Sequence, residues 1–144
     1  MVRFFGWLGK FHILVIHFPI ALLTAAAMAE LVALFRGIQV PLTAVRLAVW
    51  LGAVAAMVAV PLGWLHADVG GLGGSTGSVL ALHRWLGTIT GLWSLGVFLV
   101  SERDSYRGRR SVLFRMALAG GAALVIVTAH LGGTMVHGDQ FFEL

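Results

Sequence analysis

The clearest indication of the fold is the apolar run FHILVIHFPIALLTAAAMAELVALF, residues 11–35. It is 25 residues long, and Glu30 is its only charged residue when its two histidines are neutral. A helix that crosses a bilayer needs about 20 mainly apolar residues, and every backbone polar group in lipid must be satisfied within the segment. The stretch therefore predicts a membrane-spanning α-helix.

Three further apolar stretches have a comparable length. They cover residues 42–65, 79–100 and 112–129, and none of them alternates polar and apolar residues as a strand does. The whole chain is 59% hydrophobic and 11% charged, with a mean hydropathy of +0.94, which lies outside the range of soluble globular proteins. We expect one all-α domain over residues 1–144, an integral membrane four-helix bundle in a lipid bilayer.

The basic residues predict the orientation of this bundle. Loops on the cytoplasmic side of a membrane carry an excess of lysine and arginine, and here the first and third connections hold most of them. We therefore expect both termini and the middle loop to be extracytoplasmic, in a multi-pass protein of a bacterial inner membrane. The basic residues serve as this topology signal, so the pI near 11.2 does not indicate nucleic-acid binding. Seven belong to the cytoplasmic side, Arg36, Arg46, Arg103, Arg107, Arg109, Arg110 and Arg115, against Arg3, Lys10 and Arg84 on the other.

All six histidines fall at the extracytoplasmic end of the predicted bundle. They stand near the outer ends of the four spans, which antiparallel threading brings together. Neutral imidazole is the commonest metal ligand, and sites in helix bundles are built from facing helices. The pattern predicts a haem or metal site, formed from among His12, His17, His66, His83, His130 and His137.

The sequence predicts the place of the site more firmly than it predicts which of these histidines are the ligands. His12 and His17 are five residues apart, about 140° around a helix, so one continuous helix cannot direct both to one centre. We expect His17 and His83 as the first axial pair, and His130 with His137 as a second possible set. We expect His66 to be a polar cap at a helix end.

The chain contains no cysteine, which excludes thiolate sites and covalent haem attachment. A haem would therefore be a b-type haem, and Arg84 could pair with one of its propionates because guanidinium matches carboxylate geometry. One alternative is copper or zinc, held by His17, His83, His130 and His137. Another is a cofactor-free accessory subunit of a respiratory or photosynthetic complex. No nucleophile and base are paired in the sequence, so we do not expect a catalyst acting alone.

Two structural details are also predicted. Intramembrane charges are usually paired, and Glu30 and Arg46 lie at comparable depths on the first two spans, so we expect an ion pair between them. Gly132 and Gly133 read as the end of the fourth helix, after which the chain can turn His137 back toward the bundle.

Three motifs add a resemblance. KFHILVIHFPIALL (residues 10–23), HRWLG (83–87) and HLGGTMVHG (130–138) resemble the signatures of a bacterial family of small four-span membrane proteins, catalogued mainly as a domain of unknown function. Members are often fused to, or encoded beside, c-type cytochromes. The resemblance covers essentially the whole chain and implies a membrane module of electron-transfer chains, with His12, His17, His83, His130 and His137 as the functional set.

This resemblance implies a subunit that carries b-type haem and passes electrons between the quinone pool, or a larger redox complex, and an extracytoplasmic carrier. The sequence departs from the family pattern in two places. Many relatives have proline where Ile13 stands, which leaves this turn freer to be helical. No cytochrome domain follows His137, so a c-type haem is expected on another polypeptide.

Overall fold

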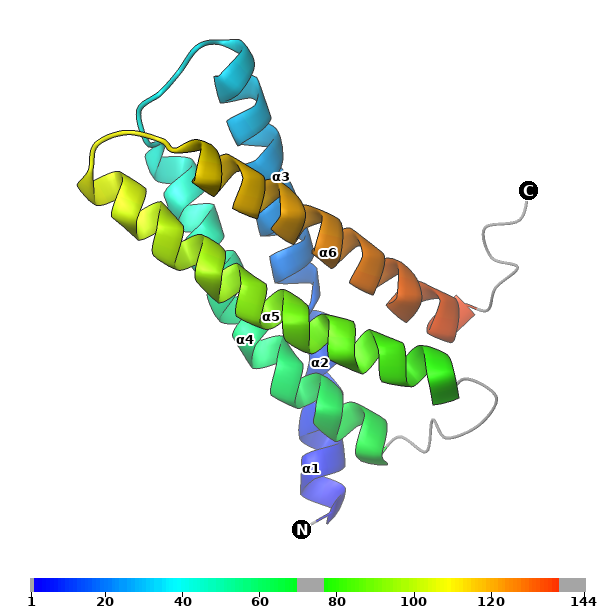
Figure 1. Ribbon diagram of the computed structural model, residues 1–144. Helices are drawn as coiled ribbons and strands as arrows, with labels where there is room; N and C mark the ends of the chain where they lie inside the picture. Colours follow the sequence, from blue (N-terminus) through cyan, green and yellow to red (C-terminus); the bar gives the residue numbers. More distant parts are fainter. Residues whose placement is uncertain (1, 70–76, 138–144) are drawn as a thin grey trace.

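The protein is described by a computed structural model that covers residues 2–69 and 77–137. This part of the chain is helical and contains no strand, which confirms the predicted all-α class (Figure 1). The elements are α1 (Val2–Gly9), α2 (Phe11–Val15), α3 (His17–Phe35), α4 (Thr43–Val69), α5 (Gly77–Tyr106) and α6 (Val112–His137). Four long helices match the four predicted segments; α4, α5 and α6 extend beyond a predicted boundary, whereas α3 begins later than predicted, after two shorter helices.

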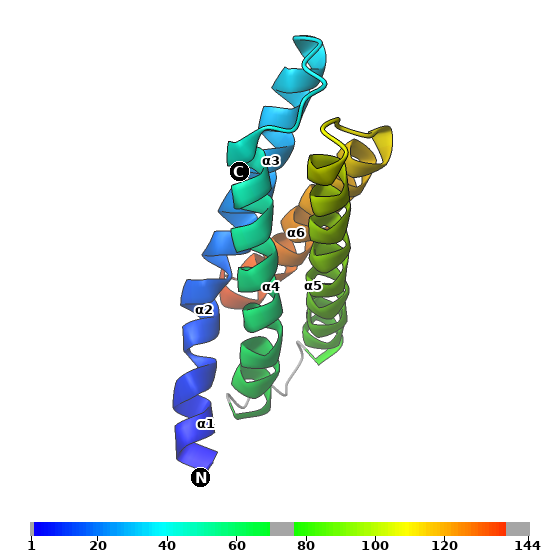
Figure 2. The same ribbon diagram turned by 90° about the vertical axis from the view of Figure 1, so that its left-hand side faces the viewer.

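The first three helices follow one another head to tail and form one long rod (Figures 1 and 2). The rod is interrupted at Lys10 and Ile16, where the backbone nevertheless keeps right-handed helical angles. The N–H of Ile16 still donates to the carbonyl of His12 at 3.0 Å. Pro19 lies in the first turn of α3, where its missing N–H costs no helical hydrogen bond. The three helices therefore continue along one direction, with two short interruptions between them.

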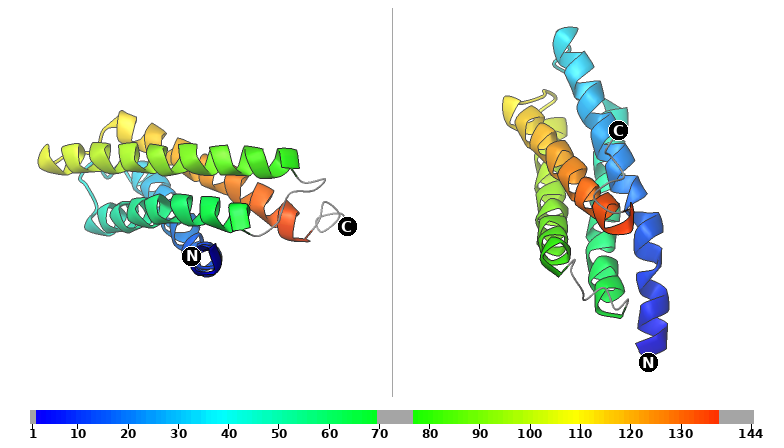
Figure 3. Two further views of the ribbon diagram at one scale, coloured as in Figure 1. Left: turned by 90° about the horizontal axis from the view of Figure 1, so that it is seen from below. Right: turned by 90° about the vertical axis from the view of Figure 1, so that its right-hand side faces the viewer.

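The four long helices pack in a ring (Figure 3). Helix α4 contacts α3 and α5, and α6 closes the ring by contacting both α5 and α3. The short helices α1 and α2 pack against α4. All four long helices contribute to the apolar core, most of which lies toward the end of the bundle away from the histidines. Its buried members are Leu23, Ala26, Val45, Val49, Val97, Phe114, Leu118 and Val125.

Three helical segments are long and apolar enough to cross a membrane, namely Gly6–Phe35, Thr43–Ala67 and Val112–Val136. Helix α5 is as long as these but carries more polar side chains, among them Thr90 and Ser94, which face the interior. Both hydroxyls donate to the carbonyl four residues earlier in their own helix, at 2.7 Å each. These two hydroxyls are thus satisfied within α5, and most of the helix's large apolar side chains are exposed.

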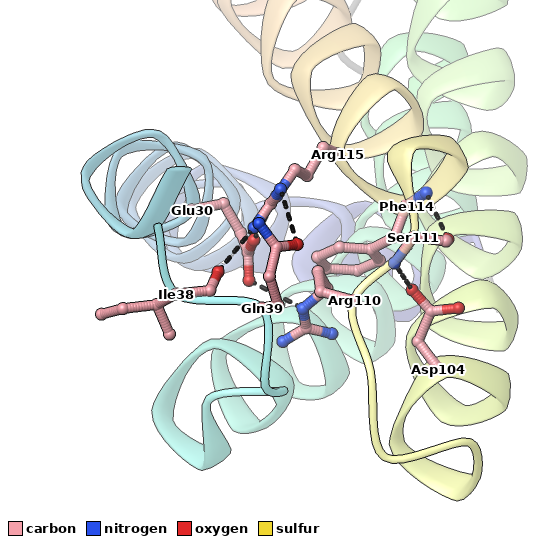
Figure 4. Close-up of polar contacts among 8 residues, drawn as sticks. All are labelled: Glu30, Ile38, Gln39, Asp104, Arg110, Ser111, Phe114 and Arg115. Carbon is pink, nitrogen blue, oxygen red and sulfur yellow. Dashed lines mark hydrogen bonds and ion pairs between the residues drawn. The ribbon is translucent and has the colours of Figure 1, made fainter. Parts of the chain in front are cut away.

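An ionic cluster ties α3 to the start of α6 (Figure 4). The carboxylate of Glu30 lies 2.8 Å from Nε of Arg110 and 3.3 Å from Nε of Arg115. Arg115 also donates to the carbonyl of Ile38 at 2.8 Å, and the backbone N–H of Arg110 donates to that of Gln39 at 2.7 Å. Glu30 and Arg110 are buried, so the cluster fastens the connection between α3 and α4 to the first turn of α6.

The predicted ion pair between Glu30 and Arg46 is therefore wrong. Arg46 instead donates twice to Glu102 of α5, through Nε and Nη2 at 2.7 Å each. Comparable depth did not determine the partner, because the rotation of each helix about its axis decides which neighbour a side chain faces. Glu30 faces α6, whereas Arg46 faces α5.

The predicted end of the fourth helix at Gly132 and Gly133 is also wrong. Helix α6 runs through both glycines to His137. Among the described residues, only Gly37 and Gly108 adopt the positive φ that ends a helix at glycine. Gly132 is instead used for packing, because it lies against the ring of His83.

Candidate functional site

His12 is held by a backbone carbonyl of the neighbouring helix. It belongs to α2, and its Nδ1 lies 2.9 Å from the carbonyl oxygen of Ala59 in α4. A carbonyl oxygen can only accept, so Nδ1 carries the hydrogen and donates it. In a neutral imidazole this leaves the lone pair of Nε2 available, which is the state that a metal ligand requires.

His83 is held in the same way by the other pair of helices, α5 and α6. It belongs to α5, and its Nδ1 donates to the carbonyl of Thr128 in α6 at 3.0 Å. The hydroxyl of Thr128 lies 3.2 Å from that of Thr90, which adds a second polar link between these two helices. The Nε2 atom of His83 is consequently also left as an acceptor.

The rings of these two histidines lie close together. Their centroids are 6.4 Å apart, and their planes make an angle of 84°. A third ring, that of His66 on α4, stacks beside His12 at a centroid distance of 6.5 Å and an angle of 24°. Three helices therefore bring three imidazoles to one place at the end of the bundle that the sequence predicted.

The remaining predicted ligands lie elsewhere or outside the description. His17 is exposed at the start of α3, where its Nδ1 donates to the carbonyl of Ile13 at 2.7 Å. The described ring contact of His83 is with His12, so the pairing of His17 with His83 stays a prediction. His130 is exposed on α6, and the side chain of His137 lies outside the described residues.

The alternative of a copper or zinc site receives no support from the geometry. Among the residues that the structure describes, no three histidine, cysteine, aspartate or glutamate side chains lie close enough to hold one metal ion. The predicted set of His17, His83, His130 and His137 is not assembled by the described side chains. A site that needs only two imidazoles remains compatible with this arrangement.

Arg84, the predicted propionate partner, lies beside His83 in the sequence and packs on a tryptophan. Its guanidinium carbon is 3.8 Å from the ring centroid of Trp64. The indole N–H of Trp64 donates to the hydroxyl of Thr88 at 3.1 Å, and this hydroxyl donates to the carbonyl of Arg84 at 2.9 Å. The ring of Trp85 meets that of Trp64 edge-on at 5.6 Å. The positive charge of Arg84 is thus held against Trp64, on the residue that follows His83 in the sequence.

A groove of about 450 Å³ lies away from this cluster, between α5 and α6. Its lining residues are apolar apart from the indole N–H of Trp93, which is already donated to the carbonyl of Ala117 at 2.8 Å. The groove offers no ligand for a metal, so the histidine cluster is the better candidate site. The lining residues are Ile89, Leu92, Trp93, Gly96, Val97, Val100 and Ala117.

No family model, curated protein or solved structure matches this chain. The resemblance of its three motifs to the four-span family therefore stays a prediction. The case for a function consequently depends on the geometry of the histidine cluster.

Sequence reasoning placed His66 at the histidine end of the bundle but left it out of the expected ligands. His66 lies in the last turn of α4, as expected of a residue at a helix end, and its ring also stacks beside that of His12. The common position of all six histidines at one end of the bundle was the signal for its place in the cluster. The choice between His12 and His17 needed the helix rotations, which the sequence does not fix.

Proposed function

We propose that this chain is a membrane electron-transfer subunit that binds b-type haem through His12 and His83. One observation carries the proposal: two imidazoles from different helices lie 6.4 Å apart, and each has its Nδ1 hydrogen donated to a backbone carbonyl. The bonds that hold both rings leave both Nε2 atoms as potential ligands. This pair replaces His17 and His83 as the expected axial set.

The separation of the rings fits two ligands of one iron. Metal–imidazole bonds are about 2 Å long, so two imidazoles on opposite sides of one metal have ring centres roughly 6 Å apart. Transition-metal ligation by histidine is usually accompanied by a hydrogen bond from the other ring nitrogen, which fixes the tautomer and raises the basicity of the ligand. The carbonyls of Ala59 and Thr128 supply that bond.

When bound, a haem held by two histidines would supply a one-electron carrier suited to electron transfer rather than oxygen chemistry. The chain's own residues hold and orient this group. Ala59 and Thr128 orient the two rings, and the guanidinium of Arg84, stacked on Trp64, provides a positive charge for a propionate. A saturated site needs no catalytic base, in keeping with a subunit that is not a catalyst alone.

The membrane context follows from the three apolar segments and the distribution of arginines. We place the chain in a bacterial inner membrane, with α5 as the fourth crossing and the histidines on the extracytoplasmic side. A haem there can exchange electrons with a c-type cytochrome or a larger redox complex outside, and with quinone in the bilayer.

A haem titration of three histidine variants in detergent tests the proposal. His12→Ala and His83→Ala should each lose the low-spin b-type spectrum, because each removes one axial ligand. His17→Ala is the matched control and should bind haem as the wild type does, since its ring is exposed and bonded within its own segment. A full spectrum in both His12→Ala and His83→Ala, or its loss only in His17→Ala, would reject the ligand assignment.

A further inference from the structure

Each of the two histidine rings lies against a glycine of the helix that holds it. A Cβ atom added to Gly63 of α4 would lie 2.8 Å from Cε1 of His12 and 3.1 Å from its Nδ1. A Cβ atom added to Gly132 of α6 would lie 3.1 Å from Cε1 of His83. Beside an alanine at position 63 the His12 ring must shift, whereas at position 132 the His83 ring must give by a few tenths of an ångström, so the conflict at Gly63 is the more severe.

The two glycines also have the same spacing from the carbonyl that accepts the ring hydrogen. Ala59 precedes Gly63 by four residues, and Thr128 precedes Gly132 by four. In an α-helix the Cβ of residue i+4 leans back toward the N-terminus and lies over residue i. A side chain at position i+4 would therefore crowd the ring that reaches this carbonyl, whereas glycine leaves the approach open.

The same arrangement thus occurs twice, once in each half of the chain. In the first half of the chain, His12 of α2 contacts α4, where Leu62 and Gly63 follow the accepting carbonyl of Ala59. In the second half, His83 of α5 contacts α6, where Leu131 and Gly132 follow the accepting carbonyl of Thr128. The two rings come from opposite halves and meet at 84°. The ring planes are consequently set by two equivalent contacts, each consisting of a carbonyl and a glycine.

We infer that Gly63 and Gly132 are positioning residues that hold the imidazole planes of His12 and His83 nearly perpendicular to each other. The inference rests on the proposed function, because the consequence is read from bound haem. Axial imidazoles with perpendicular planes leave the iron d orbitals nearly degenerate and give a strongly anisotropic low-spin EPR signal with one large g value. Parallel planes split these orbitals and give an ordinary rhombic signal.

Frozen-solution EPR of the oxidised, haem-loaded chain tests the inference. The wild type should give the strongly anisotropic signal. Gly63→Ala should lose it in favour of a rhombic signal with a smaller largest g value, because the His12 ring must rotate or leave the carbonyl of Ala59. Gly132→Ala should shift the signal in the same direction by less, since its contact is 3.1 Å and not 2.8 Å.

Two glycines of α5 provide controls. Gly91→Ala introduces a comparably close contact, 2.9 Å from a methyl group of Val60, but touches no histidine. Gly96→Ala meets nothing within 4 Å. Both variants should keep the wild-type EPR signal, which separates ring positioning from a general loss of packing.

The outcomes distinguish this inference from the function on which it rests. A haem-loaded wild type with a rhombic signal, or a Gly63→Ala signal identical to that of the wild type, overturns the positioning role and leaves haem binding intact. A folded wild type that binds no haem in a pyridine haemochrome assay overturns both. If Gly63→Ala does not fold, the wild-type signal and that of Gly132→Ala still decide the matter.

Discussion

At the scale of single residues, the buried carboxylate of Glu30 is the most consequential charge in the described structure. Its removal leaves Arg110, whose side chain is fully buried, without its ion-pair partner. Breaking a buried ion pair on one side costs about 3–5 kcal/mol. We expect Glu30→Gln to lower the free energy of unfolding in detergent by about that much, while the haem spectrum of the folded fraction stays unchanged.

The pair between Arg46 and Glu102 supplies the matched comparison. Its arginine side chain is 49% exposed, and exposed ion pairs contribute little to stability because water and salt screen them. Arg46→Ala should therefore cost much less than Glu30→Gln in the same unfolding experiment. Equal costs for the two variants would show that the cluster around Glu30 does not stabilise the fold as a buried pair should.

Asp104 makes stability depend on pH. Burial alone would raise the pKa of Asp104, but the N–H of Ser111 at 2.6 Å and the guanidinium of Arg103 at 3.3 Å outweigh burial and hold the pKa below its ordinary value. A lowered folded-state pKa stabilises the fold above the unfolded value, near pH 4, and this contribution is lost as the pH falls through the folded-state pKa.

Asp104→Asn should accordingly be less stable than the wild type at neutral pH, by about 1–2 kcal/mol. The difference should shrink as the pH falls below the unfolded value, about 4, and through the lower folded-state pKa, because protonation of the wild-type carboxylate then removes its contribution. Unfolding curves of both proteins across this range provide the measurement. A difference that grows on acidification would contradict the assignment of Asp104 as a stabilising carboxylate.

For single residues, the sequence was a good guide to which side chains need a partner and a poor guide to which partner each one has. The position of the histidines at one end, and the need of Glu30 for a positive partner, both followed from span boundaries. The partners did not, because a rotation of a helix by one residue, about 100°, exchanges one neighbour for another. This is why Arg46 was paired with the wrong acid, and why the choice between His17 and His12 could not be made from the sequence.

At the scale of elements, α1 depends on one close backbone contact. A Cβ atom on Gly9 would lie 2.7 Å from the backbone nitrogen of His66 and 2.8 Å from its Cα. Backbone atoms cannot rotate away as a side chain can, so Gly9→Ala should separate α1 from α4, at a cost of about 1–3 kcal/mol. Hydrogen exchange should then increase in residues 2–9 while α5 and α6 keep their protection. Unchanged protection of α1 would contradict this packing.

Nothing in the sequence indicated α1 as a separate helix, and the predicted end of α6 was too early. The short helix precedes the apolar run that defined the first span, so span length could not reveal it. The glycine pair at residues 132 and 133 resembles a helix stop, yet Gly132 is explained by the ring of His83, which only the packing of α5 on α6 brings there. By contrast, the number of long helices followed directly from hydropathy.

At the scale of the whole molecule, the proposed topology can be tested on a chain without cysteine. Single cysteines at Ser78, at the start of α5, and at Arg107, after its end, should react with a membrane-impermeant maleimide from opposite sides. We expect Ser78→Cys to be labelled in intact spheroplasts, and Arg107→Cys only after the membrane is opened. The reverse pattern would invert the orientation and move the histidine cluster to the cytoplasmic side.

The central claim is that the ring pair of His12 and His83 binds haem. Its most direct test is a reduced-minus-oxidised absorption spectrum of the purified wild-type chain after incubation with haem, combined with a pyridine haemochrome assay. We predict a low-spin b-type spectrum. A blank spectrum from a monodisperse, helical preparation would contradict the claim and favour the cofactor-free accessory subunit.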